Sequence, residues 1–489
     1  MESLTQANAP LFQGYLQDAS FYKGKAEQVF FPASEEEVAS LVREANRTGI
    51  PLTVAGAGTG LTGARVPAGG WVLSTEKMNR ILAIHTDADG SKGQAVVQPG
   101  VTLEALERAL SEKGLFYPPN PGEKKASVGG TVATNASGSR SFLYGPTRAH
   151  VRRLKLILPN GEPLECARGQ SREAGGEFLI GLSGGASVKV PLPRYAMPEV
   201  KNAAGYYARP GMDLIDLFIG SEGTLGIVTE IELEVLRTPP AIFGGILFFH
   251  SEEDAFLFSK QARALHPRVL EFFDSMSLTL LLKKYPQIPH EAKSALYVEQ
   301  ETYPSETEGC RSRWTSEASS FRAIVRPGWL SADPAKQADF RTFRYNLPVA
   351  VNERVAKNGF RKVATDAAVP EKNSQKMFDF YLSVLQGSEI DYCLWGHIGE
   401  NHLHANLLPT TEEEFKQALE VYAAIAKKAV SLGGTVSAEH GIGKIRIPYL
   451  EMMVGPEGLK EMARVKKALD PNGILNPGTL IPAELLKEC

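Results

Sequence analysis

Leu52-Thr-Val-Ala-Gly56-Ala-Gly-Thr-Gly60-Leu-Thr-Gly63 is the stretch of sequence that decides the fold. Its first three residues predict a short strand, and four glycines follow closely. The successive backbone N–H groups of such a loop can approach a pyrophosphate, and Thr59 and Thr62 add hydroxyl donors. A nicotinamide-binding Rossmann domain would require a helix directly after the glycines. Residues 65–70 contain Pro and two Gly, and residues 71–73 predict a strand, so this stretch disfavours a Rossmann domain.

Two further loops, within residues 118–138 and 219–227, are rich in Gly, Ser, Thr and Asn. Each loop taken alone is also compatible with an ordinary turn or a helix cap. Three such loops in one chain favour a large, elongated cofactor that has a diphosphate and a flat ring.

Histidine and carboxylate residues gather in two short segments near the C-terminus. The first is Trp395-Gly-His397-Ile-Gly-Glu-Asn-His402-Leu-His404-Ala-Asn406, and the second is Ser437-Ala-Glu439-His440-Gly-Ile-Gly443-Lys444. Together they hold four of the nine histidines. Imidazole and carboxylate groups are ligands of a divalent metal such as zinc. Any single histidine is more often structural, but the whole set favours a site. Lys444 and Arg446 are expected to be ordinary solvated cations.

Composition limits the class of protein. A chain of 489 residues needs two or three domains, and a net charge of −3 offers no basic field for nucleic acid. The four cysteines have no CxxC spacing, which excludes a Cys-ligated iron–sulfur cluster within the chain and makes a disulfide framework unexpected. The first residues do not resemble a signal peptide, and no apolar run reaches the ~18–20 residues of a membrane span. We therefore expect a cytoplasmic protein, with peripheral attachment to a membrane left open.

The pattern of short strands and helices predicts an α+β fold. Ser34-Glu-Glu-Glu37 and Thr411-Glu-Glu-Glu414 are capping boxes that open helices, and a last helix is expected from about 456 to 469. Residues 151–158 and 163–166 predict a hairpin, and residues 227–236 alternate as a half-buried strand. Beyond Arg237-Thr-Pro-Pro240 we expect strands at 242–249, 270–273, 295–300 and 392–395, with helices near 253–265 and 373–385, forming an antiparallel sheet backed by helices.

These motifs resemble the FAD-linked oxidases of the vanillyl-alcohol oxidase type, and within them the D-lactate, glycolate and D-2-hydroxyglutarate dehydrogenase group. The resemblance extends from about residue 31 to 480. It implies an FAD-binding domain of two α+β subdomains and a cap domain with an antiparallel sheet and helices. The predicted division is an N-terminal extension at 1–26, the FAD-binding domain at 27–239, the substrate cap domain at 240–430 and a C-terminal segment at 431–489 that returns to the flavin.

The resemblance also implies roles for individual residues. His397, His404 and Glu439 hold a divalent metal, with zinc as the candidate ion, and His440 is the catalytic base. Arg344 binds the substrate carboxylate and takes part in catalysis, and Asn406 contacts the substrate. His402, which the family pattern lacks, is our own further candidate for a substrate contact. The predicted flavin contacts are Gly56, Ala57, Gly58, Thr59, Gly60, Leu61, Thr62, Gly63, Pro99, Ser127, Gly129, Gly130, Thr131, Asn135, Ser137, Gly138, Glu222, Gly226, Ile227 and Asn476.

The chain departs from the family pattern at several positions. The family usually has Gly-Asp-Gly-Asn-Leu-His where this chain has Gly399-Glu-Asn-His402-Leu-His404, so His402 is an additional metal ligand or base, or a histidine outside the ligand shell. Pro348 replaces a usual Thr, and the family's lysine has no clear counterpart. Residues 56–70 contain no histidine, so the FAD is predicted to be held non-covalently.

The predicted function is FAD-dependent oxidation of a D-2-hydroxy acid to the 2-oxo acid. The hydride would pass to flavin N5, while His440 takes the hydroxyl proton of the metal-bound substrate. The electron acceptor would be a protein, a quinone or a partner subunit, and a homodimer is compatible with the sequence. The alternatives are a transferase like the alkylglycerone-phosphate synthases, a non-catalytic flavin subunit of a multi-chain oxidase, and a flavin-free zinc hydrolase. The synthases carry a run of histidines in place of Glu439-His440, which favours a dehydrogenase.

Overall fold

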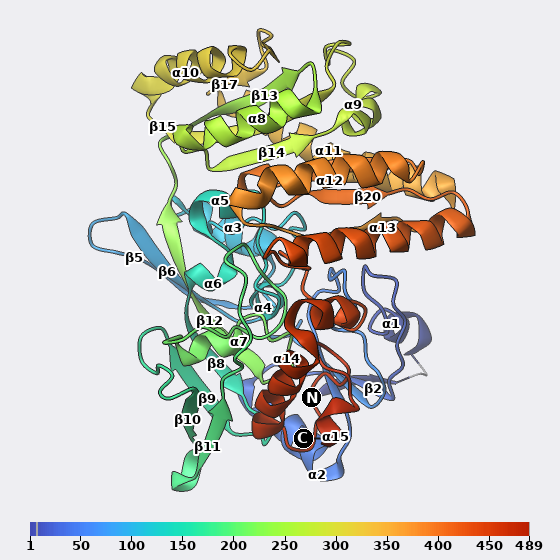
Figure 1. The fold of residues 1–489 in the computed structure, drawn as a ribbon. Helices are drawn as coiled ribbons and strands as arrows, with labels where there is room; N and C mark the ends of the chain where they lie inside the picture. The colour runs from blue at the N-terminus through green and yellow to red at the C-terminus, as the bar shows by residue number, and fades with distance from the viewer. Residues whose placement is uncertain (6–7, 489) are drawn as a thin grey trace.

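The computed structural model describes residues 1–5 and 8–488. Two larger sheets and a separate two-stranded hairpin make up the N-terminal half, and a third large sheet with its helices lies over them (Figure 1). The first sheet has parallel strands in the order β2, β4, β3, and β1 pairs antiparallel with β2. Its strands are β1 (Glu2–Thr5), β2 (Gln28–Phe31), β3 (Leu52–Ala55) and β4 (Trp71–Ser74), and the short helix α1 (Ala9–Gln13) follows β1.

Helix α2 (Glu35–Thr48) has the predicted N-terminal cap. The hydroxyl oxygen of Ser34 accepts a hydrogen bond from the backbone N–H of Glu37 at 3.3 Å, and the Glu37 carboxylate accepts one from the N–H of Ala33 at 2.8 Å. The apolar face of α2 packs against β3 and β4. The glycine loop then passes from β3 to β4 without an intervening helix, so the argument against a Rossmann domain is confirmed.

The second sheet is antiparallel, in the order β5, β6, β12, β8, β9, with β7 also paired to β12. The predicted hairpin is confirmed as β8 and β9, and the predicted alternating strand is β12. A separate hairpin, β10–β11, follows β9. The strands are β5 (Ile81–Thr86), β6 (Lys92–Val97), β7 (Leu115–Phe116), β8 (Val151–Ile157), β9 (Pro163–Ala167), β10 (Glu177–Gly181), β11 (Ser187–Pro191) and β12 (Ile227–Arg237); the helices of this region are α3 (Leu103–Ser111), α4 (Val128–Ala133), α5 (Ser141–Tyr144), α6 (Thr147–His150) and α7 (Leu214–Phe218).

The third sheet forms the cap, and its pairings are antiparallel, as predicted. Its order is β16, β13, β15, β14, β19, β20, β18, with β17 also paired to β13. The strands are β13 (Ala241–Phe249), β14 (Val269–Phe273), β15 (Ser294–Thr302), β16 (Ala323–Ile324), β17 (Leu330–Ser331), β18 (Val363–Ala364), β19 (Tyr392–Gly396) and β20 (His404–Leu407).

Helices cover both faces of the cap sheet. Helices α9 (Ser275–Leu282) and α11 (Pro334–Asn358) enclose one apolar cluster, while α8 (Glu252–Ala262), α10 (Thr307–Ser319), α12 (Ser374–Gly387) and α13 (Glu412–Ser431) contribute to the main core. The sequence did not predict α11, because its apolar residues do not form one continuous stripe and Pro348 lies inside it.

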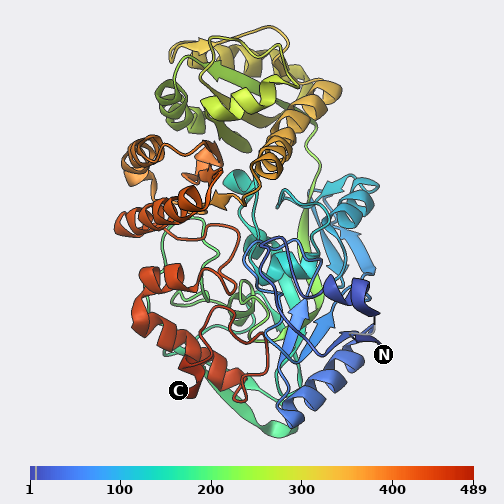
Figure 2. The same cartoon turned by 90° about the vertical axis from the view of Figure 1, so that its right-hand side faces the viewer.

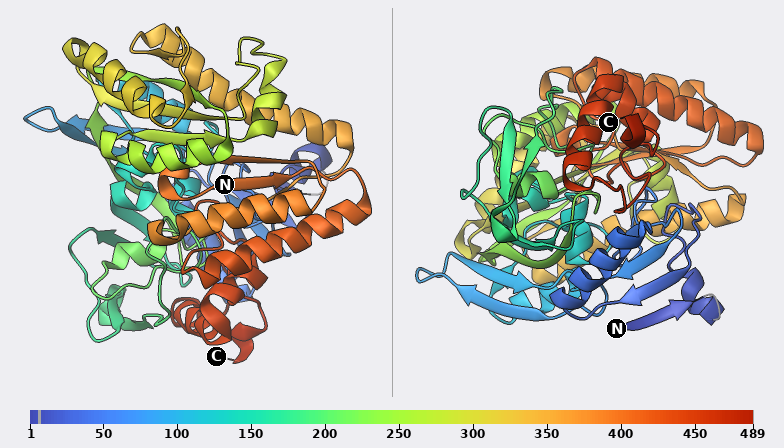
Figure 3. Two further views of the ribbon diagram at one scale, coloured as in Figure 1. Left: turned by 45° about the horizontal axis from the view of Figure 1, so that its top comes forward. Right: turned by 90° about the horizontal axis from the view of Figure 1, so that it is seen from below.

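The C-terminal segment returns to the first sheet (Figures 2 and 3). The N–H of Leu52 donates to the carbonyl of Ile474 at 2.8 Å, and the N–H of Asn476 donates to the carbonyl of Leu52 at 2.9 Å. The predicted last helix from about 456 to 469 is confirmed as the second part of α14 (Ile447–Leu469), which Gly455, with φ 74°, separates from an earlier part that was not predicted. The short helix α15 (Leu485–Glu488) follows.

Three of the cysteines, Cys166, Cys310 and Cys393, are buried free thiols, which agrees with the expected absence of a disulfide framework among them. Cys489 lies outside the described residues. In the part of the chain that the structure describes, none of the helices combines the length and apolar character that a membrane span requires.

Candidate active site

The two histidine segments meet between the cap and the C-terminal segment. His404 begins β20, and His397 follows β19, the strand paired with it. The turn between these strands includes Asn401, whose backbone is left-handed with φ 53°. Glu439 and His440 belong to the loop between α13 and α14. Strand pairing therefore sets the separation of the two histidines, and the later loop adds the carboxylate.

Glu439 lies between His397 and His404. Its Oε2 is 3.2 Å from Nε2 of His397, and its Oε1 is 3.2 Å from Nε2 of His404. One ligand atom from each of His397, His402, His404 and Glu439 falls within 4.8 Å of the others. The three predicted metal ligands thus lie together, and we call His397, His402, His404 and Glu439 the histidine cluster.

The outer nitrogens of two of these histidines are held by other groups. Nδ1 of His397 is hydrogen-bonded to the buried carboxylate of Glu271, and Nδ1–H of His404 donates to the carbonyl of Thr365 at 3.1 Å. The Nε2 atoms therefore both face Glu439. Metal-binding histidines in proteins are usually oriented in this way, so the residues present fit a divalent ion. Burial alone would lower the pKa of His397, but the charge of Glu271 outweighs it and raises the pKa to about 9.

His402 is fully buried beside these ligands. Its Nε2 is 3.0 Å from Oδ1 of Asp366, yet neither ring nitrogen makes a hydrogen bond of good geometry within the described residues. Burial, and then the neighbouring His404, lower its pKa well below the usual value, so the ring is neutral. A neutral buried imidazole with an unpartnered nitrogen adds a potential fourth ligand to the histidine cluster.

His440 lies at the more exposed edge of the cluster. Its Nε2 is 3.5 Å from Oε1 of Glu439, and its Nδ1 is 3.3 Å from Oδ2 of Asp366. Burial lowers the pKa of His440 to about 4, although Asp366 and Glu439 act in the opposite direction. The ring is therefore neutral near pH 7, which is the protonation state that a proton acceptor needs.

Asp366 organises this part of the site. Its Oδ2 accepts hydrogen bonds from the backbone N–H of His440 and from the guanidinium of Arg446, each at 2.9 Å. The expectation that Arg446 is a solvated cation is wrong, because it is 7% exposed and paired with this carboxylate. Lys444 is not freely solvated either: its ammonium donates to the hydroxyl of Thr479 at 2.7 Å.

Three residues of the site were not predicted from the sequence: Lys201, Glu271 and Asp366. The ammonium of Lys201 lies 3.1 Å from Glu439 and 3.0 Å from Glu400, with its side chain 2% exposed. Burial opposes the charge of Lys201, but Glu400 and then Glu439 raise its pKa above the usual value. Glu271 carried a usable signal, because it is the only charged residue in the buried strand Val269–Phe273, and such a carboxylate must be paired.

The predicted substrate residues Arg344 and Asn406 both lie close to the cluster. Nε of Arg344 donates to Oε2 of Glu271 at 3.1 Å, while within the described residues its two Nη nitrogens make no hydrogen bond. Asn406 follows His404 on β20, and its amide donates to the carbonyl of His404 at 3.2 Å. Arg344 therefore has two donors available for a carboxylate.

The first glycine loop presents free backbone donors. The N–H groups of residues 57–62 donate no hydrogen bond within the described chain, and Ala57, Gly60 and Leu61 are exposed. Gly58 has φ 80°, and the guanidinium of Arg65 donates to the carbonyl of Gly56 at 2.8 Å. A run of unpaired amides held in this way fits a diphosphate.

The second glycine loop packs tightly against the first. A Cβ at Gly56 would lie 2.7 Å from Oγ of Ser127, the residue that caps α4. The N–H of Gly129 donates to the carbonyl of Pro99 at 2.8 Å. Ser137 connects this loop to the histidine cluster, because its hydroxyl donates to Oε2 of Glu439 at 3.3 Å.

Three further predicted flavin contacts lie near the start of β12 or in the C-terminal segment. Glu222 accepts hydrogen bonds from the N–H groups of Ile442 and Gly443, each at 2.8 Å, and Asn476 donates to the carbonyl of Glu222 at 2.7 Å. These bonds tie the C-terminal segment to the loop that precedes β12. Ile227, at the start of β12, is buried in the core beneath α2.

Comparison with known proteins agrees with this geometry. A family model described as an FAD binding domain matches residues 26–167, and one described as the C-terminal domain of FAD linked oxidases matches residues 239–480. The chain belongs to the FAD-linked oxidases of the vanillyl-alcohol oxidase type, as its motifs predict, and is an FAD-linked oxidoreductase.

Three relatives cover almost the whole chain. It is 31% identical over 477 residues to the glycolate oxidase subunit GlcD of Bacillus subtilis, covering 95% of this chain and 91% of that protein. It is 32% identical over 473 residues to a D-lactate dehydrogenase of Anaerostipes hadrus, covering 94% and 91%. It is 30% identical over 462 residues to a D-2-hydroxyglutarate dehydrogenase of Xanthomonas citri pv. viticola, covering 92% and 88%.

A solved structure of an alkyldihydroxyacetonephosphate synthase has the same fold. It superposes with a TM-score of 0.63 at 21% identity, covering 93% of this chain and 77% of that one. This likeness concerns the fold and carries no conclusion about the reaction.

Proposed function

We propose that this protein oxidises a D-2-hydroxy acid to the corresponding 2-oxo acid. The observation that carries the proposal is the neutral His440 beside the histidine cluster, which Ser137 links to a glycine loop. The names of the relatives, which include glycolate oxidase and D-lactate dehydrogenase, support this class of substrate.

The reaction removes a hydride from Cα and a proton from the hydroxyl group. FAD, held non-covalently by the glycine loops, supplies the hydride acceptor when it is bound. His440 accepts the hydroxyl proton at Nε2, because its Nδ1 faces Asp366. The Nη nitrogens of Arg344 bind the substrate carboxylate as a two-pronged clamp.

A divalent metal, with zinc as our candidate, would be held by His397, His404 and Glu439. Such an ion supplies a Lewis acid that lowers the pKa of a bound hydroxyl group. Lys201 is paired with Glu439 and fixes the position of that carboxylate. The electrons then leave for a separate protein, a quinone or a partner subunit.

The test is anaerobic bleaching of the flavin absorbance by single D- and L-2-hydroxy acids, with metal content measured on the same sample. We expect the D-acids to bleach the flavin and a strong chelator to slow the bleaching. Full activity of metal-free protein would overturn the metal role. A chain that keeps FAD but is not reduced by any of these acids would contradict the proposed reaction and favour a transferase or a non-catalytic flavin subunit.

A further inference from the structure

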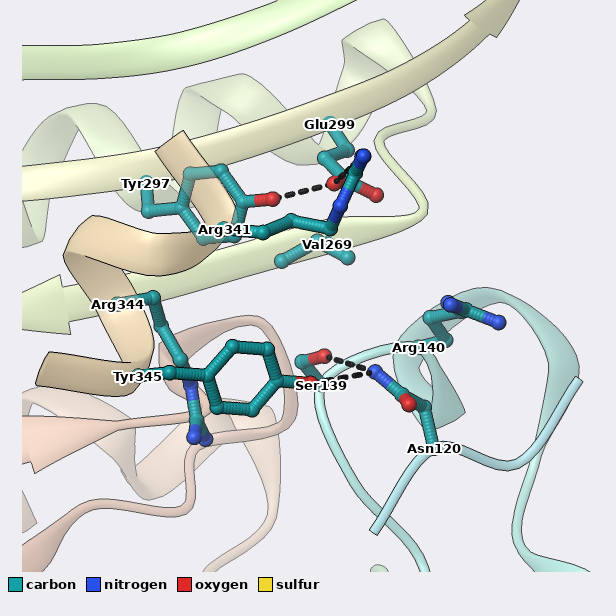
Figure 4. Close-up of a pocket in the computed structure, with 9 residues that line it drawn as sticks. All are labelled: Asn120, Ser139, Arg140, Val269, Tyr297, Glu299, Arg341, Arg344 and Tyr345. Atoms are coloured by element: carbon teal, nitrogen blue, oxygen red, sulfur yellow. Dashed lines mark hydrogen bonds and ion pairs between the residues drawn. The ribbon is translucent and has the colours of Figure 1, made fainter. Parts of the chain in front are cut away.

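A pocket lined by arginines lies between the cap and the second glycine loop (Figure 4). Asn120 and Arg140 border it from the loop side, and Glu299, Arg341, Arg344 and Tyr345 border it from the cap. We call this space the arginine pocket. It is built from both parts of the molecule, as a substrate site at their junction would be.

The charges around the arginine pocket do not balance. Glu299 is buried and already has its partners: Arg268 at 2.7 Å, the hydroxyl of Tyr297, and Arg341 at 3.5 Å. The guanidinium of Arg140 makes neither an ion pair nor a hydrogen bond within residues 1–5 and 8–488, and it lies over the ring of Phe116 at 5.7 Å.

A buried guanidinium that has neither an ion pair nor a hydrogen bond is unfavourable unless an anion binds next to it. Burial and then the neighbouring Arg268 lower the pKa of Arg140, although the charges of Glu299 and Glu107 act in the opposite direction. Arg268 and Arg341 form ion pairs with Glu299, whereas Arg140 acts on Glu299 only through its charge and has no carboxylate within ion-pair distance among the described residues.

Arg344 connects the arginine pocket to the reacting end of the site. It lines the pocket, and it contacts Glu271, the carboxylate that also holds His397. A substrate whose first carboxylate binds Arg344 can therefore extend its far end toward Arg341 and Arg140.

Resting on the function proposed above, we propose that the arginine pocket binds a second carboxylate of the substrate, so that the preferred substrate is a short 2-hydroxy dicarboxylic acid. The free volume of the pocket is about 10 Å³, about the space of one water molecule, so a carboxylate group enters only when side chains that line the pocket move. Arg341 has a long side chain that is 38% exposed, so it is the lining residue with the most room to move. The amide of Asn120 donates to the hydroxyl of Tyr345 and to that of Ser139, each at 3.4 Å, which leaves the O–H of Tyr345 as a neutral donor beside the cations.

The kinetic test compares matched acids on the holoenzyme. D-malate is compared with D-2-hydroxybutyrate, and D-2-hydroxyglutarate with D-2-hydroxyvalerate, by kcat/KM with a dye acceptor. A hydrogen bond to a charged group contributes a factor of roughly 10–100 to binding affinity. We therefore expect the kcat/KM of the diacid to exceed that of the monoacid by at least about 10-fold in one of the two pairs. Arg140→Gln and Arg341→Gln should each raise KM for that diacid and leave the monoacid unchanged. Arg140→Lys should retain part of the preference, because it keeps the charge but loses the planar fork.

The matched control is Arg47→Gln, since the Arg47 side chain is 70% exposed on α2, outside the arginine pocket. It should change the kinetics of neither substrate. Equal or better use of the monoacids, or equal loss of both substrates in the Arg140 and Arg341 variants, would overturn the inference while leaving the oxidation itself intact.

A binding experiment separates the arginine pocket from turnover. Glutarate and pentanoate have no hydroxyl group to oxidise, and calorimetry measures their affinity for the holoenzyme directly. We expect glutarate to bind more tightly and Arg140→Gln to remove the difference. If glutarate binds more tightly than pentanoate but no 2-hydroxy acid reduces the flavin, the anion-binding role of the arginine pocket is supported and the proposed oxidation is contradicted. If glutarate and pentanoate bind equally, the pocket has no anion role.

Discussion

The glycine loops and the histidine cluster occupy one site but are built by different means. The first loop is one continuous stretch after β3, and within the described chain it offers free backbone amides at residues 57–62. The cluster is made of side chains from the turn between β19 and β20, from the first residue of β20 and from the loop before α14, and Glu271 on β14 orients it. Local backbone geometry therefore determines the first glycine loop, whereas packing between distant segments determines the histidine cluster.

This difference implies that the two halves of the site can be damaged separately. A change in the cluster removes ligands or a base without touching the amides that fit FAD. A change in the first loop alters those amides without touching β19, β20 or their pairing. Ser137 is a point where the halves meet, through its hydrogen bond to Glu439.

The largest effect is expected for His440→Ala. It removes the proposed proton acceptor, so kcat should fall by about 10²–10⁴-fold, while the flavin spectrum and FAD content stay at the wild-type level. Steady-state kinetics with a dye acceptor measures kcat, and the visible spectrum measures the FAD content. His85→Ala, on the exposed part of β5, is the matched control and should keep full activity. Loss of FAD together with activity would contradict the separation of the two halves.

The next largest effect is expected for Glu271→Gln. Glu271 is not a proposed ligand, but it holds Nδ1 of His397 and Nε of Arg344. Replacing such an orienting carboxylate typically weakens metal binding about 10–100-fold. Metal titration of the chelated protein should show that loss, and KM for the hydroxy acid should rise with it. Unchanged metal affinity would mean that His397 is not a ligand.

A smaller effect is expected in the loop, for Gly58→Ala. Gly58 has φ 80°, and a Cβ there would lie 2.6 Å from Nη1 of Arg65. A left-handed backbone at a non-glycine residue is unfavourable by roughly 1–2 kcal/mol, so FAD should bind about 5–30-fold more weakly. Equilibrium titration of the apoprotein with FAD measures this change, and the metal content should stay the same.

Gly211→Ala is the control for Gly58→Ala. Gly211 has φ 73°, and a Cβ added there would meet no atom within 4 Å, so the variant carries the same backbone strain outside the loop. It should keep FAD binding unchanged. Equal FAD loss in both variants would show that general destabilisation, and not the loop, is responsible.

The same difference explains what could be predicted from the sequence. The capping box at Ser34, the hairpin of β8 and β9 and the absence of a helix after the first glycine loop follow from local rules, and the structure confirms them. The clustering of His397, His404 and Glu439 was expected from a family resemblance rather than from local rules.

The partners of those side chains could not be predicted in the same way. Glu271 lies 126 residues before His397, and Asp366 lies 73 residues before Glu439, so no spacing rule connects them to the cluster. Helix α11 was missed because its apolar residues do not form one stripe. Arg446 was misjudged because a lone arginine in a loop is usually solvated, whereas here Asp366 is buried next to it.

His402→Asn gives the smallest expected change and tests the boundary between ligand and neighbour. His402 is buried among the ligands with no good hydrogen bond in the described chain, so as a fourth ligand it should slow metal release without being required for binding. We expect the variant to hold its full metal content at saturating metal but to release the metal to a chelator several-fold faster, because a lost ligand that stabilised the bound metal by about 1.4 kcal/mol changes the equilibrium roughly tenfold. We also expect an altered visible spectrum of the cobalt-substituted protein. An unchanged cobalt spectrum would place His402 outside the ligand set. The metal would then rest on His397, His404 and Glu439 alone, and the buried imidazole would act only through Asp366.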